Sequence, residues 1–102
     1  KNKIFQMSSQ TTVKIVSTTS ESPFEGMATI CGGDSCLMVE VKFKKESFVN
    51  KTNVEKFLNN VVNYLIEKEG CTLEKLPENF SISELMSKYT NLTEAKLKSF
   101  ID

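Results

Sequence analysis

The sequence predicts an α+β fold, in which an antiparallel meander of three to four strands packs on one long amphipathic helix and two short helices follow. β-branched residues and turn signals lie in residues 1–47, whereas helix caps and helical periodicity lie in residues 52–101. The chain has 102 residues, 39% of them apolar, and no repeat or low-complexity linker interrupts it. We therefore expect one α+β domain over residues 1–102, and the first residue, Lys1, indicates a processed product or a piece of a longer chain.

The clearest unit of the predicted meander is a hairpin around Gly32-Gly33-Asp34-Ser35, a run of turn-forming residues between two apolar segments. The register that places Cys31 opposite Cys36 also aligns an aromatic pair, Phe24 with Phe43, and an opposite-charge pair, Glu25 with Lys42. Pairs of this kind stabilise neighbouring strands, so this register is the one we predict.

A third strand is predicted upstream, where Thr11 to Thr18 alternates Val13 and Ile15 with polar neighbours. Ile4 to Met7 is either a short fourth strand or a frayed terminus.

The long helix is predicted over residues 53–69. Thr52-Asn53-Val54-Glu55 has the form of a capping box, and Gly70 is a stop signal. Its apolar residues cover more than half of the helix circumference, which is wider than a sheet alone can bury. Either the C-terminal helices or another chain must cover the remainder.

The two short helices are predicted over residues 82–89 and 94–101. Ser81-Ile82-Ser83-Glu84 is a second capping box, and Thr93 followed by Glu94 is a third helix start.

Composition excludes several kinds of chemistry. The sequence contains no His and no Arg, which removes His-based catalysis, His metal ligands and bidentate recognition of phosphate or guanine. Thirteen basic residues balance thirteen acidic ones, so we expect no nucleic-acid partner. The cluster Lys42, Lys44 and Lys45 is predicted to be the solvated end of a strand. We also expect no membrane span, no cofactor, no metal site, no small-molecule substrate and no enzymatic activity.

The three cysteines leave two interpretations open. Cys31 and Cys36 face each other across the predicted hairpin at a separation that permits a disulfide, and Cys71 is left over. An odd count argues against a secreted disulfide scaffold, so reduced cysteines in an intracellular protein are favoured over a disulfide in a secreted one.

Three glycosylation sequons are present, starting at Asn50, Asn79 and Asn91. In each of them the hydroxyl residue is also a predicted helix N-cap, so folding alone explains Thr52, Ser81 and Thr93.

These observations lead us to expect a non-enzymatic interaction or assembly domain that binds another protein or a second copy of itself. Two surfaces are predicted to bind the partner. One is the apolar helix face, at Phe57, Val61, Tyr64 and Leu65, and the other is the strand edge, at Thr12, Lys14 and Val16. The alternative is a small secreted or surface-exposed glycoprotein with a Cys31–Cys36 disulfide.

Overall fold

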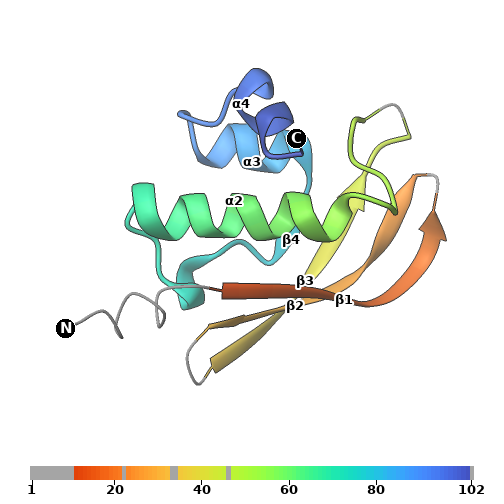
Figure 1. Ribbon diagram of the computed structural model, residues 1–102, viewed down its shortest axis with the longest axis horizontal. Coiled ribbons are helices and arrows are strands. Elements are labelled where there is room, and N and C mark those ends of the chain that lie inside the picture. The colour runs from red at the N-terminus through yellow and green to blue at the C-terminus, as the bar shows by residue number, and fades with distance from the viewer. Residues whose placement is uncertain (1–10, 22, 33–34, 46, 102) are drawn as a thin grey trace.

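The computed structural model describes residues 11–21, 23–32, 35–45 and 47–101, and it has the predicted α+β architecture. The sheet has the order β1-β2-β3-β4, and the helices α2, α3 and α4 lie on the same side of it (Figure 1). The strands are β1 (Thr11–Glu21), β2 (Phe24–Gly32), β3 (Ser35–Phe43) and β4 (Asn79–Phe80). The helices are α2 (Val54–Lys68), α3 (Ile82–Lys88) and α4 (Glu94–Ser99), with a short 3₁₀ helix, η1 (Leu73–Lys75).

The antiparallel meander and its register are confirmed. β2 and β3 pair with Cys31 opposite Cys36, Phe24 opposite Phe43 and Glu25 opposite Lys42. β1 pairs with β2, and its strand extends beyond the predicted Thr18 to Glu21. The expected strand at Ile4 to Met7 lies outside the described residues.

β1 departs from regular pairing twice, between Ile15 and Ser17 and between Thr18 and Ser20. Gly26 of β2 lies against this stretch, because a Cβ built on it would overlap the carbonyl oxygen of Ser17. Only glycine has no Cβ, so this residue permits β1 to approach β2 closely where it bulges.

The fourth strand of the sheet was not predicted. β4 contributes only Asn79 and Phe80, which pair in parallel with Glu40 and Val41 of β3 and make the sheet mixed. The backbone N–H of Glu40 also donates to the carbonyl of Glu78. Two residues are too few to show the period-two alternation by which a strand is recognised in a sequence.

α2 begins one residue later than its predicted cap implies. Its N-cap is Asn53, whose side chain makes no capping hydrogen bond, and not Thr52. The Thr52 hydroxyl donates to Asn50 Oδ1, and Glu55 accepts from the backbone N–H of Ile15 in β1. The predicted capping box is therefore wrong, because a local contact with Asn50 takes the Thr52 hydroxyl and a tertiary contact with β1 takes the Glu55 carboxylate. Gly70 ends the helical segment with a φ of 69°, as the sequence indicated.

The predicted caps of α3 and α4 are present. Ser81 Oγ accepts from the backbone N–H of Glu84, and Thr93 Oγ1 accepts from that of Lys96, both at 3.2 Å. Both helices end one or two residues before the predicted limits, at Lys88 and Ser99.

The core lies between the sheet and the helices. The sheet supplies Ile30, Val39 and Val41, and α2 supplies its wide apolar face. Leu85 of α3 and Leu97 of α4 are fully buried in the same core. The C-terminal helices are therefore the cover for the part of α2 that the sheet leaves open.

Candidate functional site

The apolar face of α2 is core in this chain. Phe57, Val61 and Leu65 have no exposed surface, so a partner cannot reach them in this conformation. Tyr64 is half-buried, with its ring centroid 5.6 Å from that of Phe100 beside α4. Three of the four residues expected to form an open binding face, Phe57, Val61 and Leu65, are therefore buried in the core, whereas Tyr64 keeps exposed surface.

The edge of β1 is partly occupied. Thr12, Lys14 and Val16 have exposed side chains, and Val16 is 55% exposed at the first irregularity of the strand. The edge amides of Thr11 and Ile15, however, already donate to side chains of α2. A partner strand would have to displace these hydrogen bonds.

The hairpin of β2 and β3 carries a disulfide between Cys31 and Cys36. Cys71 is free, and its Sγ lies 4.0 Å from the Tyr89 hydroxyl oxygen. Burial, followed by the neighbouring Cys71, raises the pKa of Tyr89 to about 12.

The three sequon asparagines are exposed but differ in their contacts. Asn50 Oδ1 accepts from both the backbone N–H and the hydroxyl of Thr52. Asn79 lies in β4, and Asn91 Nδ2 donates to Glu69 Oε2.

The described residues form a groove of about 440 Å³. It lies between the end of β3, the loop that leads to α2, and the helices α3 and α4. Its lining combines basic, hydroxyl and apolar residues: Lys42, Lys44, Ser47, Phe48, Ser81, Ile82, Ser83, Met86, Glu94 and Lys98.

The apolar part of the groove is fixed to the core. Phe48 packs edge-on against Phe57, with ring centroids 5.9 Å apart, and Phe57 in turn packs against Phe43. Ser47 stabilises the same loop, because its Oγ accepts from the N–H of Val49 and donates to the Val49 carbonyl. Ile82 is half-buried, and Met86 is 36% exposed. The groove therefore has an apolar wall that packs against the core and remains partly exposed to solvent.

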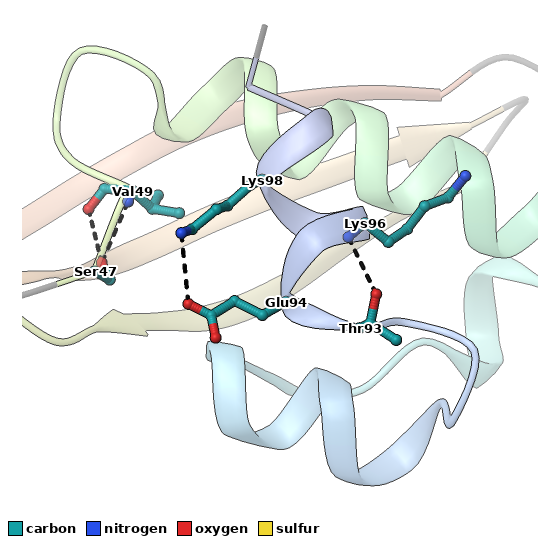
Figure 2. A network of polar contacts seen from close by, with 6 residues as sticks. All are labelled: Ser47, Val49, Thr93, Glu94, Lys96 and Lys98. Atoms are coloured by element: carbon teal, nitrogen blue, oxygen red, sulfur yellow. Dashed lines mark hydrogen bonds and ion pairs between the residues drawn. The ribbon is translucent and has the colours of Figure 1, made fainter.

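The charged part of the groove is predominantly positive, with three lysines against one glutamate. Figure 2 shows Lys98 extending from α4 toward the loop of Ser47 and Val49, next to Glu94, whereas Lys96 points to the other side of α4. Lys98 Nζ lies 3.8 Å from Glu94 Oε2 and 5.8 Å from the ring centroid of Phe48. Within the described part of the chain, Lys42 and Lys44 form no ion pair, although Glu25 lies opposite Lys42 in the neighbouring strand β2.

The sequence indicated only part of this site. The sequence predicts a solvated strand end at Lys42 and Lys44, and both are exposed, but they line the groove together with Lys98. The sequence pattern does not mark the apolar residues Phe48, Ile82 and Met86 as site residues. The helical spacing of Ile82 and Met86 was visible, but their meeting with Phe48 depends on the tertiary fold.

The groove can bind an anionic group beside an apolar one, since lysine ammonium groups and apolar side chains lie in the same concavity. Among the residues that the structure describes, no three His, Cys, Asp or Glu side chains gather in a way that could hold a metal ion. None of the described helices has the length and hydrophobicity needed to cross a membrane.

Comparison of the chain with protein-family models, with curated proteins and with solved structures finds no match.

Proposed function

We propose that this chain is a non-enzymatic interaction domain that binds an acidic segment of a partner protein in the groove. The observation that carries the proposal is a groove of about 440 Å³ in which an apolar wall packed on the core lies beside two lysines, Lys42 and Lys44, that form no ion pair among the described residues. An apolar side chain of the partner contacts Phe48, Ile82 and Met86, while flanking carboxylates face the lysines.

The choice of an acidic occupant rests on charge complementarity. The chain as a whole has equal numbers of basic and acidic residues, so an excess of two lysines in one concavity is a local feature. Glu94 is already paired with Lys98 and therefore repels an acidic ligand less than an unpaired carboxylate would. Complementary charge accelerates association and selects the partner, whereas apolar contact supplies most of the affinity.

The test is a selection of peptides from a random displayed library with the folded chain as bait. We expect enriched peptides to carry Asp or Glu around one apolar residue. A synthetic copy of an enriched peptide is then titrated against the wild type, against Lys42→Glu/Lys44→Glu, and against the control Lys14→Glu/Lys68→Glu, which changes exposed lysines outside the groove.

The groove variant should bind at least about tenfold more weakly, equivalent to about 1.4 kcal/mol, while the control retains wild-type affinity. Circular dichroism verifies that each variant is folded. Enrichment of basic or uncharged peptides, absence of enrichment, or equal loss of affinity in both variants would reject the proposal.

The Cys31–Cys36 disulfide favours a second proposal, a small secreted or surface-exposed glycoprotein. Asn50 is its preferred acceptor because, unlike the other two sequons, its hydroxyl residue caps no helix. Non-reducing peptide mapping of protein from its native source tests this. A Cys31–Cys36 cross-link and a glycan mass on Asn50 are expected, whereas three free thiols would remove the proposal.

A further inference from the structure

The outer edge of β1 is closed by side chains of α2. β1 is the first strand in the order β1-β2-β3-β4, so one side of its backbone has no neighbouring strand among the described residues. The backbone N–H of Ile15 donates to Glu55 Oε2 at 3.0 Å, and that of Thr11 donates to Asn63 Oδ1 at 3.3 Å. The Thr11 hydroxyl also donates to Asn63 Oδ1, at 2.7 Å. Two edge amides of the strand are therefore already bonded within the chain.

The two contacts belong to a periodic match between helix and strand. Glu55, Asn59 and Asn63 lie at successive intervals of four residues and form one stripe along α2, about 12 Å long. Thr11, Val13 and Ile15 direct their amides to the same side of β1 over about 13 Å, because backbone groups alternate along a strand. The helix runs opposite to the strand, so Asn59 falls at the level of Val13.

Asn59 is the middle member of this stripe. Its Oδ1 is buried and has no hydrogen-bond partner among the described residues. A buried polar atom of this kind is uncommon in a folded protein. The stripe thus supplies three polar side chains along the helix side that faces the edge, and two of them, Glu55 and Asn63, accept hydrogen bonds from edge amides.

The strand itself has little that would prevent pairing with a copy of itself. From Thr11 to Thr18 its one charged residue is Lys14. In a symmetric antiparallel pair centred on Val13, Lys14 would lie opposite Thr12 of the second copy, so like charges would not meet. Beyond Ile15 the two irregularities of β1 interrupt the edge, and such bulges are a common means of blocking strand addition.

We propose that the stripe of Glu55, Asn59 and Asn63 blocks the β1 edge and so prevents it from pairing with a second copy of this chain. When these side chains no longer accept hydrogen bonds from the β1 amides, Thr11–Ile15 becomes a surface to which the same strand of a second copy adds in antiparallel orientation. This inference is independent of the groove, which lies among other elements.

The test compares the wild type with Glu55→Ala/Asn63→Ala and with the control Glu67→Ala, which removes a carboxylate from an exposed position of α2. Amide hydrogen exchange is measured by NMR at low concentration, and the mass by sedimentation over a concentration series. The double variant should exchange the amides of Thr11 and Ile15 about tenfold faster and form a concentration-dependent dimer, whereas the control should behave as the wild type.

The register of the dimer provides a second, independent test. Adding Thr12→Lys to the double variant places lysines opposite each other in the proposed pair, and Thr12 is exposed in the monomer. The triple variant should return to a monomer.

If the double variant does not fold, Glu55→Gln and Glu55→Ala are compared instead. The glutamine retains an acceptor and should stay monomeric, while the alanine should associate. Unchanged exchange, or fast exchange in a persistent monomer, would overturn the inference.

Discussion

Gly26 illustrates how one residue determines the shape of a strand pair. A Cβ at this position would overlap the carbonyl oxygen of Ser17 and contact the Thr18 backbone. We predict that Gly26→Ala lowers the free energy of unfolding by about 2–4 kcal/mol, because backbone atoms must move to admit the methyl group. Urea denaturation followed by circular dichroism measures this.

Gly70→Ala is the matched control for that prediction. The φ of Gly70 is 69°, but a Cβ there would have nothing within 4 Å. Only the left-handed backbone conformation opposes the substitution, so a smaller loss of about 1 kcal/mol is expected. If both alanine variants lost the same stability, the close contact between β1 and β2 would not be the cause.

Tyr89 is expected to make stability depend on pH in the alkaline range. Burial and the neighbouring Cys71 raise its pKa from 10.0 to about 12. Between these values the unfolded chain has released the phenolic proton and the folded chain has not, so rising pH favours unfolding. The contribution of Tyr89 is thus fully present below pH 10 and is lost toward pH 12.

Urea denaturation of the wild type and of Tyr89→Phe at pH 9 and pH 11 tests this dependence. The wild type should lose more stability than the variant between the two values, because phenylalanine has no proton to release. Equal losses would show that the phenol ionises alike in the folded and unfolded chains.

At the scale of elements, substitutions at the helix starts distinguish the residues that cap a helix from one that does not. Ser81→Ala and Thr93→Ala each remove an N-cap hydrogen bond and should cost about 1 kcal/mol in the free energy of unfolding. Thr52→Ala removes only an exposed contact with Asn50 and should cost less. Thermal or urea denaturation of the three variants ranks them. A cost for Thr52→Ala as large as the others would contradict the assignment of Asn53 as the N-cap of α2.

The same elements explain what the sequence could predict. The register of β2 and β3 was predictable because Phe24 and Phe43, and Glu25 and Lys42, all agree on one alignment. The start of α2 was not predictable, because the Glu55 carboxylate accepts a hydrogen bond from the backbone N–H of Ile15, which lies 40 residues away in the sequence. Local signals identify an element, but a distant hydrogen bond can decide where a cap side chain goes.

At the scale of the whole molecule, the arrangement of helices decides which surfaces are free. The helices α2, α3 and α4 lie on one side of the sheet (Figure 1), so the apolar face of α2 becomes core. The width of that face was visible in the sequence, and it correctly required a further cover. The groove was not predictable as a site, because its lining comes from three separated parts of the chain, which begin at Lys42, Ser81 and Glu94.

The central claim, that the groove binds an acidic segment, is tested most directly by mapping a bound peptide on the folded protein. Backbone amide shifts of the isotope-labelled chain are recorded while the library-selected acidic peptide is added. The account predicts saturable shifts concentrated at the groove residues, around Phe48, Ile82 and Lys98, which Lys42→Glu/Lys44→Glu weakens. Shifts confined to the uncovered side of the sheet, around the exposed Met38, would contradict it.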